Sequence, residues 1–206
     1  MHTRHARHGF SLIELMVTMA ILALVVMASI PSFSTWMRNT QVRTAAESLQ
    51  AGLQKARAEA VRRNEPVSFW LVANAVPTVL DASCTLSTTS ASWVVAINNP
   101  AGLCDRAPSA TQAPKLIDKH PRGESGSQVS VTVFAEDCVT PVNSSQTRFN
   151  GFGQVVAAGG DAIRCLQIDH ISGLEARRLR IAISNGGSVR MCDPAVVSDA
   201  DPRKCY

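Results

Sequence analysis

The stretch Gly9-Phe10-Ser11-Leu12-Ile13-Glu14 joins a short basic leader to an apolar run that continues to Ile30. The run from Phe10 to Ile30 has 21 positions, about the length that an α-helix needs to cross the hydrocarbon core of a bilayer. Its one charged side chain is Glu14. Because a carboxylate in hydrocarbon costs about 2.5–3.5 kcal/mol, the position of Glu14 indicates a partner for its charge. The sequence therefore predicts a membrane helix, 10–30, that carries a functional carboxylate.

The leader, residues 1–9, carries Arg4 and Arg7 and is expected to lie in the cytoplasm, which places the C-terminal domain in the periplasm. An ordinary secretory signal is the alternative. Such a signal has an apolar region of about 7–15 residues and an A-x-A-like cleavage site. The run here is longer, and Ser29-Ile30-Pro31 matches that site poorly. We therefore expect the apolar segment to remain in the mature protein as a single-pass inner-membrane helix.

The segment GFSLIELMVTMAILALVVMASIP, residues 9–31, resembles the cleavage site and N-terminal helix of type IV pilins and pseudopilins. The shared features are glycine before the cut, phenylalanine after it, Glu14 at the fifth mature position and Pro31 at the twenty-second. The resemblance implies that a prepilin peptidase cleaves between Gly9 and Phe10 and that Phe10 becomes N-methylated. It also implies that Glu14 pairs with the methylated amine of a neighbouring subunit. Other pilins or pseudopilins are then the partners of this helix, first in the membrane and later in a filament.

The segment 31–65 is expected to continue the helix as an amphipathic element. Apolar residues recur three or four positions apart, as one face of a helix requires. They are Val42, Ala46, Leu49, Leu53, Ala56 and Ala60. Asn64-Glu65-Pro66 predicts the end of the helix, because the residue before a proline is pushed out of the α region. The whole helix would be roughly 80 Å long at 1.5 Å per residue, and we expect Pro31 and Gly52 to bend or loosen it.

After Pro66 the apolar period changes to two, which predicts a β-rich domain over residues 66–206. The expected strands are Val67–Ala73, Trp93–Asn98, Val129–Ala135, Gln154–Ala157, Ile163–Ile168, Leu179–Ser184 and Ser188–Met191. The stretch Asn98–Gln128, rich in proline, serine, glycine and charge, is interpreted as a long loop. A helix followed by an antiparallel sheet gives the α+β class and a pilin-like fold. The shared core should contain Leu49, Leu53, Ala56, Phe69, Leu71, Val131, Val133, Leu179 and Ile181.

The stretch RRLRIAISNGGSVRMCDP, residues 177–194, is similar to the C-terminal hairpin of the FimT/GspH family of minor pilins and pseudopilins. This resemblance implies a minor pilin, assembled into a type IV pilus or its initiation and tip complex. The alternative is the H-type pseudopilin (GspH) of a type II secretion system. Both use the same N-terminal helix and Glu14, so the choice stays open. The arginines of this stretch, and a C-terminal tail that a disulfide between Cys192 and Cys205 would close, favour the pilus.

Basic residues cluster in the same region. They are Arg178, Arg180, Arg190, Arg203 and Lys204. Some FimT-type minor pilins are implicated in DNA capture through a Gly-Arg-x-Arg motif, whose positions here read Gly187-Ser188-Val189-Arg190 and keep one arginine. Without Arg4 and Arg7 the chain has 18 basic against 16 acidic side chains, so only local clustering could attract nucleic acid. Binding of double-stranded DNA is therefore a hypothesis, and a solvated strand face is its alternative.

Six cysteines lie beyond the apolar run, and no two of them form a C-x-x-C pair. They are Cys84, Cys104, Cys138, Cys165, Cys192 and Cys205. An even number in an exported chain favours disulfides over a metal site. Six cysteines allow fifteen pairings. One such pairing closes a loop with Cys84–Cys104, closes the tail with Cys192–Cys205 and leaves Cys138–Cys165.

Enzymatic readings of the sequence find little support. His120 lies before a proline, and His170 follows Asp169, but neither has the spacing to other ligands that a metal site needs. The chain has no nucleophile elbow and no phosphate-binding loop. We therefore expect a protein without catalytic activity, cofactor or metal.

Overall fold

The computed structural model describes residues 10–157, 162–173 and 176–205, with no side-chain description for 28–32 and 124–125. The chain forms two compact units that meet between Met37 and Arg38. Gly9 lies outside the described residues.

Helix α1 extends without a break from Leu12 to Arg63. It begins with a cap, in which the hydroxyl of Ser11 accepts a hydrogen bond from the Glu14 backbone N–H at 3.2 Å. It ends at Asn64, which has a φ of 50°. The N–H of Glu65 donates to the carbonyl of Ala60 at 3.3 Å, as in a Schellman motif. The predicted end near Asn64 is thus confirmed, whereas the helix continues through position 31.

Within the first unit, the described side chains from Phe10 to Met27 are all exposed in the single chain. Over the part of the chain whose side chains are described, no helix is both long and apolar enough to cross a membrane.

The second unit contains two antiparallel sheets where the sequence predicted one. The first sheet has the order β4-β3-β1-β6-β7, and β2 also pairs with β1. Its strands are β1 (Val67–Ala73), β2 (Thr85–Leu86), β3 (Ser92–Ala96), β4 (Leu116–His120), β6 (Gln146–Phe149) and β7 (Val155–Val156). Strand β1 begins and ends where the sequence predicted.

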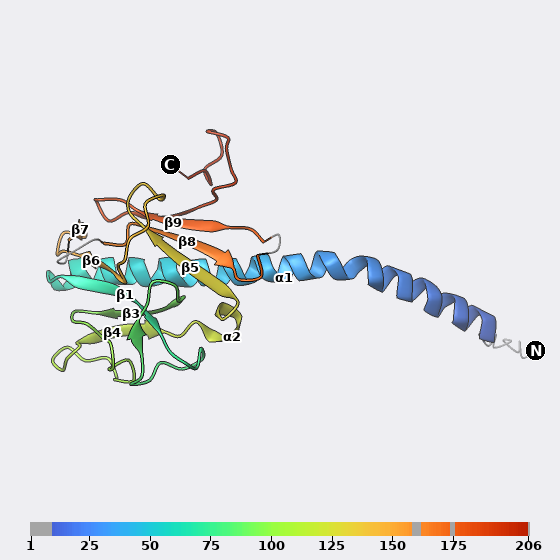
Figure 1. The fold of residues 1–206 in the computed structure, drawn as a ribbon, viewed down its shortest axis with the longest axis horizontal. Coiled ribbons are helices and arrows are strands. Elements are labelled where there is room, and N and C mark those ends of the chain that lie inside the picture. The colour runs from blue at the N-terminus through green and yellow to red at the C-terminus, as the bar shows by residue number, and fades with distance from the viewer. Residues whose placement is uncertain (1–9, 158–161, 174–175, 206) are drawn as a thin grey trace, which may run out of the picture. The chain divides into compact units, whose positions relative to one another are not determined.

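The second sheet has the order β10-β9-β8-β5. Its strands are β5 (Val129–Phe134), β8 (Cys165–His170), β9 (Leu179–Ile183) and β10 (Val189–Cys192). A one-turn helix, α2 (Gly123–Gly126), precedes β5. Figure 1 shows β8 and β9 on one side of the second half of α1 and β1, β3 and β4 on the other, with β5 crossing the helix in this view.

The main core forms where α1 meets both sheets. All nine residues predicted for this core are buried in one cluster, so that prediction is confirmed. At Gly52 the helix lies close against the first sheet, since an added Cβ would lie 2.7 Å from Cδ2 of Trp93 and 2.8 Å from Cε2 of Phe69. Gly52 therefore serves as a contact point between helix and sheet, a role that the sequence did not reveal.

The other face of the first sheet covers a second, smaller core. Trp70, Val94 and Leu116 pack there around the disulfide between Cys84 and Cys104. This second layer explains why β1 is buried on both faces and lacks the in–out alternation of a half-exposed strand.

The expectation of a long loop over Asn98–Gln128 was wrong in part, because the stretch contains β4 and α2. Strand β4 pairs with β3 at the edge of the first sheet. Its sequence, Leu-Ile-Asp-Lys-His, carries two charged residues, as is common in an edge strand, and shows no apolar alternation. Strands β2 and β6, two and four residues long, were likewise not predicted.

Candidate functional site: the N-terminal motif and a basic outer face

The first candidate site is the start of α1. Phe10 is 84% exposed, and Glu14 is exposed in the first helical turn. A carboxylate there faces the positive end of the helix dipole. In the single chain, the carboxyl group of Glu14 thus lies in the first turn of the helix, near the backbone N–H groups at its start. The hydrogen bond to Ser11 involves the backbone N–H of Glu14, and no side chain of the described residues binds its carboxylate.

The second candidate site lies on the face of the second sheet that points away from the core. Along β9, Leu179, Ile181 and Ile183 are buried, while Arg180 is half-buried on the opposite face. Arg190 of β10 lies opposite Ala182 in the register, on the same outer face. Arg180 and Arg190 therefore lie on one face of the second sheet.

Oxygen atoms of neighbouring side chains bind most of these cations. Arg178 donates to Asp169 at 2.5 Å, and Arg180 donates to the amide oxygen of Gln167 at 2.9 Å. Gln167 in turn donates to Asp169 at 2.8 Å. These contacts form a chain of polar groups across β8 and β9, which lowers the positive potential that the sequence alone suggested.

The C-terminal tail repeats this pattern. Arg203 donates to Asp201 at 2.6 Å, and these hydrogen bonds lower the pKa of the Asp201 carboxyl to about 2. Lys204 forms an ion pair with Asp199. Acidic residues of the tail thus partly neutralise the tail cations.

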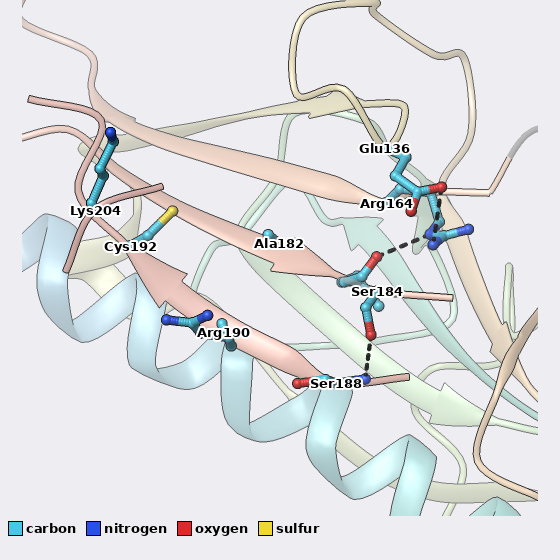
Figure 2. A pocket seen from close by; sticks show the side chains of 9 residues that line it. Glu136, Arg164, Ala182, Ser184, Ser188, Arg190, Cys192 and Lys204 are labelled. Carbon is cyan, nitrogen blue, oxygen red and sulfur yellow. Dashed lines mark hydrogen bonds and ion pairs between the residues drawn. The ribbon is translucent and has the colours of Figure 1, made fainter. Parts of the chain in front are cut away.

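A pocket of about 220 Å³ opens on this face between the sheet, the loop after β5 and the tail (Figure 2). Arg164, Arg190 and Lys204 line it from three separate segments, together with Glu136. Arg164 is held in place, since Nε donates to the carbonyl of Ile183 at 3.1 Å and Nη1 donates to Asn185 at 2.7 Å. The structure therefore adds Arg164 to the predicted basic residues.

Sequence reasoning missed Arg164 for a physical reason. It lies two residues before Leu166 and four before Ile168, both fully buried, so strand alternation assigns it to the core face. Arg164 lies just before the first residue of β8, and its long side chain turns outward there. No signal in the local pattern could have placed it in the pocket.

The structure joins the six cysteines as Cys84–Cys104, Cys138–Cys165 and Cys192–Cys205, the pairing set out from the sequence. Two of these bonds border the basic face, one at the loop after β5 and one at the tail. A third contact holds the tail: Arg177 binds Asp193, which is 5% exposed, at 2.6 Å. The walls of the pocket are therefore fixed by covalent and ionic contacts.

The two described histidines, His120 and His170, both contact neighbouring side chains. His170 bonds to Gln41 of α1 at 3.0 Å and to the Ser172 hydroxyl at 2.7 Å. The Asp169 carboxylate binds Arg178 and Gln167, as described above. His120 stacks on Trp93 with 5.7 Å between ring centroids. In the described parts of the chain, no group of three histidine, cysteine or acidic side chains is placed to hold a metal ion.

A long helix packed on antiparallel sheets and headed by Phe10 and Glu14 defines a pilin-like subunit. Residues 45–187 match the family described as type II transport protein GspH, and residues 4–30 match the prokaryotic N-terminal methylation motif. The chain belongs to the GspH family of minor pilins and pseudopilins, which are structural subunits of type IV pili or type II secretion systems. No curated protein sequence matches the chain.

Solved structures with a similar fold include the type IV minor pilin FimU of Pseudomonas aeruginosa, at 17% identity and a TM-score of 0.45, covering 83% of this chain and 99% of that one. The minor pseudopilin EpsH of the Vibrio cholerae type 2 secretion system has 13% identity and a TM-score of 0.43, covering 76% and 99%. Escherichia coli GspH has 15% identity and a TM-score of 0.42, covering 80% and 94%.

Proposed function

We propose that the chain is a minor pilin, built at low copy into a type IV pilus or its initiation complex. A prepilin peptidase would cleave between Gly9 and Phe10, and the new amine of Phe10 would be methylated. The segment 10–30 would hold the subunit in the inner membrane until assembly, with the domain after residue 66 in the periplasm. The observation that carries this proposal is the N-terminal methylation motif over residues 4–30, within which the capped helix α1 begins at Leu12. In this role the subunit has no catalytic activity.

Assembly would use the charge of Glu14. In a bundle of apolar helices, the carboxylate of Glu14 and the methylated amine of Phe10 on a neighbour are each costly without a partner. Pairing them removes both costs, and any other axial register leaves both charges unpaired. The pair would therefore select the register in which one subunit meets the next.

Processing and assembly can be tested separately. Gly9→Val should leave the leader attached, because the peptidase must fit a small residue at the cut, and intact-mass analysis would detect the uncleaved chain. Glu14→Val should be cleaved and methylated normally yet be depleted from sheared filaments, with Glu14→Asp as the control that keeps the charge. A mature chain starting near residue 30 would contradict the proposal, since an ordinary secretory signal would then have been removed.

A pseudopilin of a type II secretion system is the alternative within the same family. The tail closed by Cys192–Cys205 and the basic residues beside it favour the pilus. A strain that lacks the gene separates the two roles. Loss of twitching and transformation supports the pilus, whereas loss of exoprotein secretion with normal twitching supports the secretion system.

Binding of DNA is a second candidate function, favoured by the convergence of Arg164, Arg190 and Lys204 on one pocket. Such a surface would contact phosphates without reading bases. Three phosphate contacts predict a slope of about −2.7 in a plot of the logarithm of the binding constant against the logarithm of the salt concentration. Salt titration of the full chain in detergent against random duplex DNA tests this. Arg190→Gln with Lys204→Gln should flatten the slope, while the exposed helix variant Arg43→Gln should not; absence of binding at low salt would exclude this role.

A further inference from the structure

A groove of about 550 Å³ lies between α1 and the hairpin that joins β9 to β10, and it shares Ser188 with the lining of the pocket in Figure 2. Gln54, Ala58 and Val61 of the helix form one wall, and Gly187 to Val189 form the other. The assignments above leave this groove without a role.

The hairpin wall is held rigidly in place. Gly187, with a φ of 76°, lies against the turn between β6 and β7, so that an added Cβ would stand 1.8 Å from the carbonyl oxygen of Gly153. The backbone N–H of Val155 donates to the carbonyl of Asn185 at 3.1 Å and joins the same two turns. The shape of the groove is thus set before any partner arrives.

Arg57 places a fixed positive charge in this groove. Its Nε donates to the carbonyl of Gly153 at 3.1 Å, and its Nη2 donates to the carbonyl of Gly186 at 3.4 Å. Both acceptors are neutral, and among the described residues no carboxylate forms an ion pair with Arg57. By contrast, Arg62 on the same wall is paired with Glu59 at 2.6 Å. The fold therefore orients the charge of Arg57, and no carboxylate of the described residues compensates it.

Apolar side chains accompany this charge. Val61 is 51% exposed on the helix wall, and Val189 is half-buried opposite. Phe152 is 82% exposed in the adjacent β6–β7 turn, immediately before Gly153. The turn is ordered, since the side-chain oxygen of Asn150 accepts from the N–H groups of Phe152 and Gln154 at 3.0 Å. An exposed aromatic ring on a rigid turn is a low-entropy contact for another protein.

We propose that this groove binds an extended segment of a partner protein in which an apolar side chain lies next to a carboxylate. The apolar side chain would cover Val61 and Val189, and the carboxylate would pair with Arg57. Charge complementarity selects this occupant. A second copy of the chain, the other candidate occupant, is an outcome of the test below.

The test uses the full chain in detergent micelles and two fluorescein-labelled peptides. One has a leucine flanked by glutamates in a glycine–serine context, and the other has lysines in place of the glutamates. We expect the glutamate peptide to bind at least about tenfold more tightly. Ala58→Asp and Arg57→Gln should each weaken its binding about tenfold. Ala58 is an exposed position of the helix, so Ala58→Asp should not disturb the fold. It therefore still tests the groove if Arg57→Gln loosens the two turns.

Val197→Asp is the matched control, since Val197 is 84% exposed but lies in the tail. It should bind like the unaltered chain, and melting curves should show that all variants remain folded. Equal affinity for the two peptides, or equal affinity in Ala58→Asp and the control, would overturn the proposal. Concentration-dependent dimers that Ala58→Asp disperses would assign the groove to a second copy and would overturn it as well.

Discussion

Gly52 of α1 and Trp93 of β3 are in such close contact that no larger residue fits at position 52. An added Cβ would lie 2.7 Å from the indole ring. The same ring donates from Nε1 to the hydroxyl of Ser48, one turn earlier on the helix, at 3.0 Å. Trp93 thus makes two contacts that help to position the helix on the first sheet.

Gly52→Ala is therefore expected to destabilise the domain, although alanine is the better helix former. The gain in helix propensity is about 1 kcal/mol, and overpacking costs about 1–3 kcal/mol. Urea unfolding followed by tryptophan fluorescence measures the balance. The exposed position Ala51 is the control, where Ala51→Gly should cost about 1 kcal/mol through propensity alone. A more stable Gly52→Ala protein would show that the ring can move aside freely.

Leu53→Asp tests the shared core of helix and sheets. Leu53 is fully buried, so the new carboxylate would have no water and no cation, at a cost of about 3–5 kcal/mol. Its exposed neighbour provides the control, because Gln54→Asp should change stability by about 0.5 kcal/mol or less. If Leu53→Asp melts like the unaltered protein, the helix does not pack as described.

The ion pair of Arg177 and Asp193 should contribute more to the free energy of unfolding than the exposed ion pair of Arg203 and Asp201 in the tail. Arg177→Gln leaves the buried carboxylate of Asp193 without its cation, which costs about 1–3 kcal/mol. Arg203→Gln removes an exposed pair with Asp201 and should cost about 0–1 kcal/mol. Equal unfolding free energies for the two variants would contradict this ranking.

His170 should make stability depend on pH. Burial and the nearby Arg38 charge lower the pKa of its imidazole below 6.5. The unfolded chain then binds the proton more readily, so the contribution of His170 is complete above pH 6.5 and is lost as the pH falls through the folded pKa. Protonation would also place a hydrogen on Nδ1, which could then no longer accept the hydrogen bond from the Ser172 backbone N–H.

The measurement is urea unfolding between about pH 5 and pH 8. His170→Gln should flatten the profile over this range, while His120→Gln is the comparison at another histidine. A profile that keeps its slope in His170→Gln would assign the pH dependence to other groups.

The local pattern of the sequence determined much of the fold of this protein. The N-terminal motif, the end of α1 at Asn64 and the bounds of β1 depend on residues that are close in sequence, where caps, proline and apolar period act directly. The predicted core was also correct, because a buried face repeats with the period of its own element.

Tertiary structure alone decided the rest. The division into two sheets, the edge strand β4 and the pairing of the strand arginines depend on partners many residues away. Arg164 is the clearest case. Strand alternation predicts a core position for it, whereas its hydrogen bonds to Ile183 and Asn185 place it in the basic pocket. The same holds for Arg57, whose carbonyl partners at Gly153 and Gly186 are 96 and 129 residues away. A local period specifies which face of an element is buried, whereas the choice of a charge's partner requires the packed chain.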